Sequence, residues 1–156
     1  MTIGELVAAV RVRESAYSDC PTEQARVYAC EDVCEEQMPS RLLDADETCA
    51  MVARIAHAED IDPPRTTVSA RFRRTRGAAD VENRTVHLAG PPVPLLVVVH
   101  EMAHFTSTSP AHGPDFLHEM MSMTRAHVSL DHASLLHTLY TGAGLALPPW
   151  PAIRRR

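Results

Sequence analysis

Two histidines and a glutamate stand in this sequence at a spacing that can bind a metal and move a proton, in His100-Glu101-Met102-Ala103-His104. If the segment is helical, histidines at positions i and i+4 lie on one face, and both rings can bind one Zn²⁺. Glu101 then lies beside a water molecule that the zinc polarises, where a carboxylate can accept a proton and pass it to a leaving group. The pattern predicts metal-dependent hydrolysis, with His100 and His104 as zinc ligands and Glu101 as the general base.

A catalytic zinc ion usually has three protein ligands and one open position, so a third ligand is needed. We predict His112, because it follows a turn that contains Pro110 and precedes a helix start, which lets the chain bring the ring back to the first two histidines. Glu119 is the alternative, because zinc peptidases of another type take a glutamate from the following helix. The segment His118-Glu119 begins like the motif but has Ser122 in place of the second histidine, so we do not count it as a second copy.

The chemistry requires a helix under the motif. The apolar run Leu95 to Val99 precedes His100, and periodicity alone leaves open whether such a run is a buried strand or a buried helix. The spacing of the histidines favours the helix. The stretch from Gly90 to Pro94 contains three prolines and interrupts the chain before this run, and residues Thr106 to Pro110 end the element.

Further helices are predicted from apolar residues at helical spacing and from start and stop signals. They are a weak one without a strong cap at residues 6–12, one after Pro21 with Val27, Cys30, Cys34 and Met38 on one face, one from the capping box of Asp44 and Glu47 up to Pro63, one from Pro114 to about His127, and one from Leu130 to Tyr140. Cys30 and Cys34 share an apolar face, so we expect buried thiols there rather than metal ligands.

Two segments alternate like half-buried strands, Thr66 to Phe72 and Arg84 to Leu88, with a turn region containing Gly77 and Asn83 between them. We expect them to form an antiparallel hairpin. Its tip would carry Arg73, Arg74 and Arg76. A group of arginines at a loop tip is expected to be a solvated face, with contact to nucleic acid or an acidic partner as the alternative.

The chain has 156 residues, of which 45% are hydrophobic and 22% charged, which predicts one globular domain with a real core. We expect residues 1–20 to be a loosely attached leader, residues 21–145 the domain, and residues 146–156 a Pro- and Arg-rich tail. The net charge of −5 argues against strong nucleic-acid binding by bulk electrostatics. No apolar run approaches the length that crosses a bilayer, so we expect a cytoplasmic protein with four free thiols and no disulfide framework.

For the other polar residues in the second half of the sequence, the pattern gives weaker evidence of a functional role. The remaining histidines there are expected to be structural or solvent-facing: His87, His118, His127, His132 and His137. Asp115 or Glu119 could accept a hydrogen bond from the second ring nitrogen of a metal-bound histidine. Tyr140 could stabilise an oxyanion, but a tyrosine on an apolar helix face is more often a core residue.

The motif and the segment His112-Gly113-Pro114-Asp115-Phe116 together resemble the H-E-x-x-H and H-G-x-x-F arrangement of SprT-like (Spartan-type) metallopeptidases. The likeness is closer to a group of small predicted metallohydrolases of actinobacteria and their phages, in which a helix similar to Arg26-Val27-Tyr28-x-x-Glu31-Asp32 opens the domain. It covers roughly residues 22 to 142. The resemblance implies zinc ligation by His100, His104 and His112 and a catalytic role for Glu101. Many SprT-like proteins carry a Cys-rich zinc ribbon after the catalytic part, and this sequence departs from that pattern because it has no cysteine beyond Cys49.

These observations lead us to expect an α+β, zincin-like metallopeptidase domain in which a small antiparallel sheet packs on the H-E-x-x-H helix between flanking helices. The expected function is zinc-dependent hydrolysis of a peptide bond, with an extended polypeptide substrate pairing along Arg84 to Leu88. Two alternatives remain open, a metal-binding interaction protein without catalysis and a hydrolase of non-peptide amides. We expect no membrane partner.

Overall fold

The computed structural model describes residues 1–72 and 76–149, and these residues form α-helices and small β-sheets, as the expected α+β class requires. The chain divides into two compact units. One contains the described residues of Ser40–Ser107, and the other contains Met1–Pro39 together with residues 108–149. Because the motif helix and the sheet both lie in the Ser40–Ser107 unit, that unit is described first.

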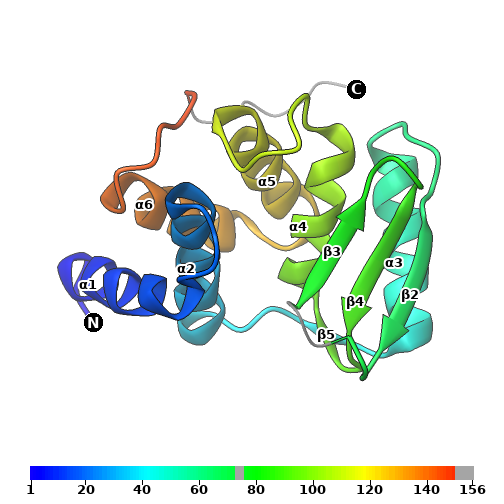
Figure 1. The fold of residues 1–156 in the computed structure, drawn as a ribbon, viewed down its shortest axis with the longest axis horizontal. Coiled ribbons are helices and arrows are strands. Elements are labelled where there is room, and N and C mark those ends of the chain that lie inside the picture. The colour runs from blue at the N-terminus through cyan, green and yellow to red at the C-terminus, as the bar shows by residue number, and fades with distance from the viewer. Residues whose placement is uncertain (73–75, 150–156) are drawn as a thin grey trace. The chain divides into compact units, whose positions relative to one another are not determined.

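In the part that the structure describes, the Ser40–Ser107 unit combines two helices with five short strands. In chain order these are β1 (Leu42–Leu43), α3 (Ala45–Ala58), β2 (Arg65–Ser69), β3 (Gly77–Asp80), β4 (Thr85–Ala89), β5 (Val93–Pro94) and α4 (Leu95–Thr106). Strands β2, β4 and β3 form one sheet in that order, and β1 pairs with β5 in another (Figure 1). Helices α3 and α4 pack on each other, and α4 also contacts β3 and β4.

The predicted antiparallel hairpin between residues 66–72 and 84–88 is wrong. Strands β2 and β4 are parallel, with Thr66 opposite Val86, and the antiparallel partner of β4 is β3, with Ala79 opposite Val86. Period-2 alternation identifies a strand but not its partner or its direction. The short run that forms β3, Gly-Ala-Ala-Asp, has no β-branched or aromatic residue, so its sequence reads as part of a turn.

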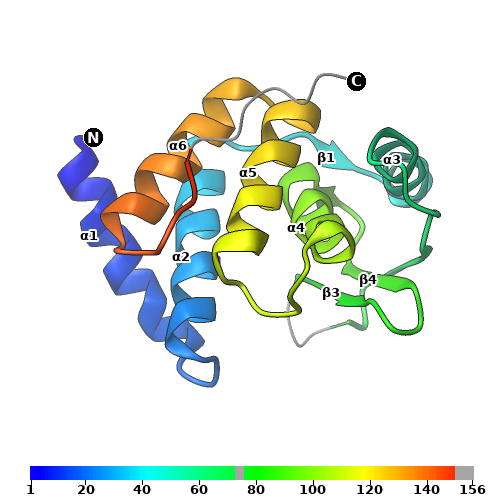
Figure 2. The ribbon, with the colours of Figure 1, turned by 90° about the horizontal axis from the view of Figure 1, so that it is seen from above.

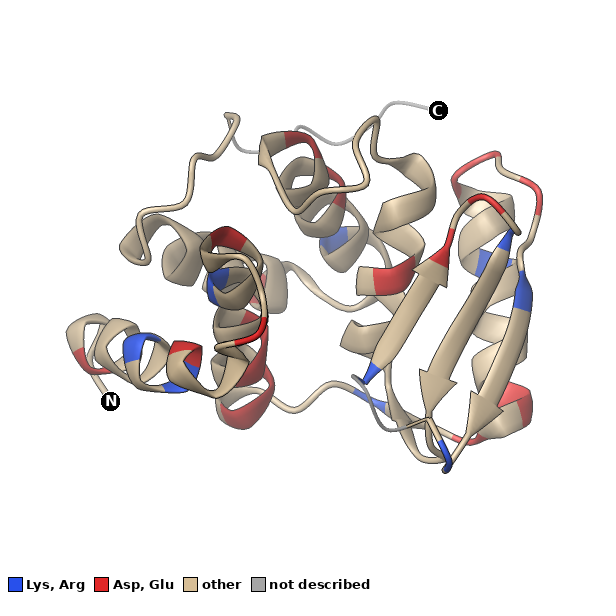
Figure 3. Cartoon of the chain, viewed as in Figure 1, with Lys and Arg blue, Asp and Glu red and all other residues tan. Residues whose placement is uncertain are grey.

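The tip of the real hairpin is the turn between β3 and β4 rather than an arginine group. Asp80 accepts hydrogen bonds from the backbone N–H and the side-chain amide of Asn83, both at 2.9 Å, and these bonds lower the pKa of the Asp80 carboxyl. Arg76 immediately precedes β3 and lies outside this turn. Arg73 and Arg74 lie outside the described residues. Charged residues of both signs mark the ends of the strands (Figure 3).

Strand β4 is the central strand of its sheet, which corrects the expectation that residues 84–88 offer an edge to a substrate. Both of its neighbours, β2 and β3, use its backbone hydrogen-bonding groups. Val86 and Leu88 on this strand are fully buried. The strand therefore belongs to the core of the unit, and β3 is the edge strand that contacts α4.

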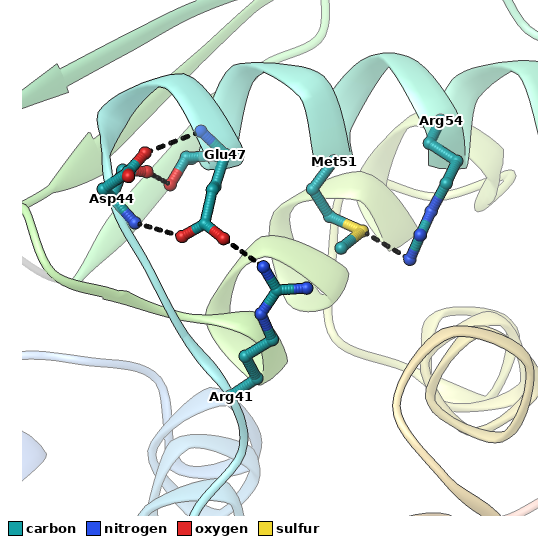
Figure 4. Close-up of polar contacts among 6 residues, drawn as sticks. Arg41, Asp44, Glu47, Met51 and Arg54 are labelled. Carbon is teal, nitrogen blue, oxygen red and sulfur yellow. Dashed lines mark hydrogen bonds and ion pairs between the residues drawn. The ribbon is translucent and has the colours of Figure 1, made fainter.

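Helix α3 begins at the predicted capping box, which is confirmed. The Asp44 side chain accepts a hydrogen bond from the backbone N–H of Glu47 at 2.8 Å, and the Glu47 carboxylate accepts one from the N–H of Asp44 at 3.0 Å (Figure 4). Arg41 forms an ion pair with Glu47 at the same place. These contacts satisfy backbone donors that a helix start leaves without partners. They set the start of a helix whose inner face buries Met51, Val52, Ile55 and Ala56.

The other unit is helical in the residues that the structure describes. Its elements are α1 (Ile3–Glu14), a 3₁₀ turn (Ser15–Tyr17), α2 (Thr22–Gln37), α5 (Pro114–His127) and α6 (Leu130–Gly142). Helix α6 packs on each of the other three helices, and α1 also packs on α2 (Figure 2). The predicted helices after Pro21, Gly113 and Ser129 are confirmed. The expectation of a weakly capped first helix is wrong, because Thr2 and Glu5 form a capping box.

The core of this helical unit contains buried thiols and a buried tyrosine. Cys30 and Cys34 are fully buried, as predicted, and burial raises the pKa of the Cys34 thiol to about 12. Tyr140 is also fully buried, and its hydroxyl donates a hydrogen bond to the Glu31 carboxylate at 3.0 Å. Burial, together with the nearby Glu31 charge, raises the pKa of Tyr140. The core role of Tyr140 is therefore the one that the structure supports.

No helix in the described part of the chain combines the length and the apolar character needed to cross a bilayer.

Candidate metal centre

The motif lies on helix α4, as the histidine spacing predicts. Pro94 is the N-cap of α4. Proline lacks a backbone N–H, but no intrahelical hydrogen bond is lost at this position. The helix is apolar on most sides, and its buried residues include Leu96, Val99 and Met102. Because it packs against α3, β3, β4 and β5, the backbone that carries the motif is held from several directions.

His100 and His104 stand one helical turn apart and face the same side of α4. Their ring centroids are 5.2 Å apart and the ring planes meet at 70°. His100 has an exposed fraction of only 3%, and His104 is half-buried. One member of the pair is therefore withdrawn from water and the other is more accessible.

Glu101 lies between the two histidines in the sequence. Its side chain is buried and lies against the start of β3. Its exposed fraction is 5%, although it carries an ionisable carboxyl group. A Cβ atom placed on Gly77 would lie 2.6 Å from Glu101 Oε1 and 2.8 Å from its Cγ, so Glu101 occupies the space that any other side chain at position 77 would need. The sequence prediction placed Gly77 in a turn and missed this contact. A glycine within a strand is a known signal of close approach, but the sequence around Gly77 reads as part of a turn, so the signal could not be recognised.

His112 lies in the segment between α4 and α5 and is held in an aromatic setting. It is buried, with an exposed fraction of 8%. The Phe116 ring lies edge-on to it at 4.6 Å between centroids, and the Tyr28 ring at 5.2 Å. The Tyr28 hydroxyl accepts a hydrogen bond from Gln24 at 2.9 Å. Helix α5 starts directly after His112, with Gly113 as N-cap and Pro114 in the first turn, so the ring is fixed just before a rigid element.

Three histidines could together hold a metal ion. His100, His104 and His112 each offer one ring nitrogen, and these nitrogens all lie within 4.8 Å of one another. Neutral imidazoles suit zinc and also copper, iron and nickel, so the donor set fits a transition metal without naming it. Among the described residues this is the one group of three or more such donors, and Glu119, the alternative third ligand, is outside it.

Two of the other histidines have structural hydrogen bonds. His132 is buried in the helical unit, where its Nε2 lies 2.9 Å from the Met38 carbonyl oxygen and its Nδ1 lies 2.7 Å from the Ser129 hydroxyl. His87 lies 2.7 Å from the Thr67 hydroxyl and stacks on Phe72. The structural roles expected for these two residues agree with the contacts.

The remaining candidates lie on α5 and α6. His118 and Glu119 are half-buried on α5, and His127 and His137 are half-buried at the end of α5 and on α6. Asp115, expected as a possible partner of a metal-bound histidine, is exposed and accepts a hydrogen bond from the Thr108 hydroxyl.

No protein-family model matches the chain, and neither a curated protein nor a solved structure is detectably similar to it.

Proposed function

We propose that this protein is a zinc-dependent hydrolase and that it cleaves peptide bonds. The observation that carries the proposal is the group of three imidazole nitrogens within 4.8 Å of one another, two of them on a helix that also holds the buried Glu101. Three neutral histidines with a nearby carboxylate are the donor set of a catalytic zinc site, because they leave one coordination position for water. The resemblance to SprT-like metallopeptidases in the motif residues supports the same reaction class.

Metal binding and proton transfer would be carried out by different residues. His100, His104 and His112 would hold the zinc, which when bound supplies a polarised water molecule. Glu101 would accept a proton on its carboxylate and deliver it to the nitrogen of the leaving group. Burial of Glu101 withdraws this carboxylate from bulk water and limits the positions that its oxygens can take.

A purely structural metal site is the rival, and the buried glutamate argues against it. Structural zinc sites are usually closed by four protein ligands, whereas the group here has three. A site that only holds a metal for structure has no use for a general base, so Glu101 beside the two helix histidines favours a catalytic site.

A polypeptide substrate would lie along β3 rather than along β4. An extended chain can add to the edge of a sheet through backbone hydrogen bonds, which tolerate many side chains. Because β3 is the edge strand that contacts the motif helix, residues Ala78 and Ala79 are the place where such pairing would bring a peptide bond toward Glu101.

The proposal is tested on a panel of unstructured polypeptides incubated with the zinc-loaded protein. We expect slow cleavage that a chelator stops and that added zinc restores. The Glu101→Gln protein, purified in the same way, is the blank. Equal cleavage by the two proteins would identify a contaminating protease, and no cleavage by either would favour the metal-binding protein without catalysis.

The third ligand has its own test. If His112 binds the metal, His112→Ala should weaken zinc binding strongly, because a ligand is lost. Glu119→Ala should weaken it by roughly 10–100-fold at most, the effect of an outer partner. Zinc affinity measured by competition with a coloured chelator compares the two variants directly. The opposite order would make Glu119 the ligand.

A further inference from the structure

The contact between Gly77 and Glu101 is closer than any side chain at position 77 would allow. A Cβ atom there would lie 2.6 Å from Oε1, 2.8 Å from Cγ and 2.9 Å from Cδ of Glu101. Contacts under 3.0 Å essentially never occur for real Cβ atoms, so one of the two groups would have to move. Cγ is among the three atoms, so rotation of the terminal carboxylate alone would not relieve the overlap.

The backbone conformation at position 77 does not require a glycine. Among the described residues the glycines with positive φ are Gly90 and Gly144, so Gly77 adopts a conformation that is open to other residues. A glycine within a strand lowers the stability of the strand, because glycine loses more conformational freedom on folding than other residues do and has no side chain to pack. What position 77 requires is therefore the absence of a side chain.

The strand holds its place more firmly than the glutamate does. Gly77 pairs with Leu88 in the ladder between β3 and β4, and the neighbouring Arg76 carbonyl accepts a hydrogen bond from the Ala89 N–H at 2.9 Å. Leu88 is fully buried, so a shift of β3 would disturb the core. Glu101 is anchored by a packed helix but keeps rotatable side-chain bonds. A side chain at position 77 would therefore displace the Glu101 carboxylate.

We propose that Gly77 is a positioning residue for Glu101, and that the first residue of β3 lacks a side chain so that the carboxylate is confined beside His100 and His104. Its consequence for catalysis rests on the proposed function, in which Glu101 carries the proton. A displacement of about 1 Å at a reacting group can lower the rate roughly 100-fold. Gly77 would thus affect turnover by positioning the Glu101 carboxylate, without binding the metal.

The contact is tested first without metal, by thermal unfolding of four proteins: wild type, Gly77→Ala, Glu101→Ala and the double variant. In the wild-type background, Gly77→Ala should lower the unfolding temperature by at least about 2 °C. In the Glu101→Ala background the same change should have no effect or raise it, because the overlap is gone and alanine suits a strand better. Gly4→Ala is the matched control, since a Cβ there meets only Thr2 Oγ1 at 4.0 Å.

The second measurement compares zinc affinity and turnover. Gly77→Ala should bind zinc as the wild type does and lose about 100-fold in turnover, while Gly4→Ala changes neither. If Gly77→Ala fails to fold but the double variant folds, the coupling is also established. Equal effects of Gly77→Ala in both backgrounds would overturn the proposal, and so would unchanged turnover. A wild-type protein that binds zinc but cleaves nothing would contradict the proposed function instead, and the unfolding comparison would still decide whether Gly77 positions Glu101.

Discussion

Replacing His104 with alanine is expected to remove most of the metal from a protein that otherwise carries about one zinc ion per chain. His104 supplies one of three nitrogens that lie within 4.8 Å of one another, so its loss leaves two ligands on a site that needs at least three. The affinity should fall by more than the roughly 10–100-fold that loss of an outer partner causes. Elemental analysis after dialysis, together with chelator competition, measures the change.

The matched control is His57→Ala. His57 is an exposed histidine near the end of α3 and is not part of the three-histidine group, so its removal should leave the zinc content unchanged. Thermal unfolding of both variants without metal shows whether either substitution harms the fold. Wild-type protein that holds no metal, even after zinc is added at neutral pH, would contradict the proposed metal centre.

Replacing Glu101 with glutamine is expected to abolish nearly all turnover while zinc stays bound. Glutamine keeps the size of the side chain, and thus its fit against Gly77, but it cannot take a proton from water. General-base catalysis contributes typically 10²–10⁴-fold, so turnover should fall by about that factor. Single-turnover cleavage of an unstructured polypeptide and zinc analysis of the same sample measure the two properties together.

Glu82→Gln is the control for this substitution, because Glu82 is exposed in the turn between β3 and β4 and should be silent. A Glu101→Gln protein that loses its zinc would make Glu101 a ligand, and the assignment of roles would need to change. A variant that keeps full turnover would show that another group carries the proton.

Local sequence signals predicted the helices well. The capping box at Asp44 and Glu47 and the proline at the start of α5 act through hydrogen bonds and backbone restrictions within a few residues. Such signals can be read without knowledge of the fold. Two missed signals at helix starts were also local, since Thr2 and Glu5 have the same capping spacing and the Ser129 side chain caps α6.

The spacing of His100, Glu101 and His104 by itself determined that the two imidazoles share a helix face with a carboxylate beside them, because 3.6 residues per turn fixes that geometry wherever the helix forms. Strand pairing was different. Alternation marked β2 and β4 as strands, but their parallel direction and the insertion of β3 depend on contacts between residues far apart in the chain. Only the tertiary structure could bring Gly77 against Glu101, because that contact joins a strand and a helix whose packing no local pattern encodes.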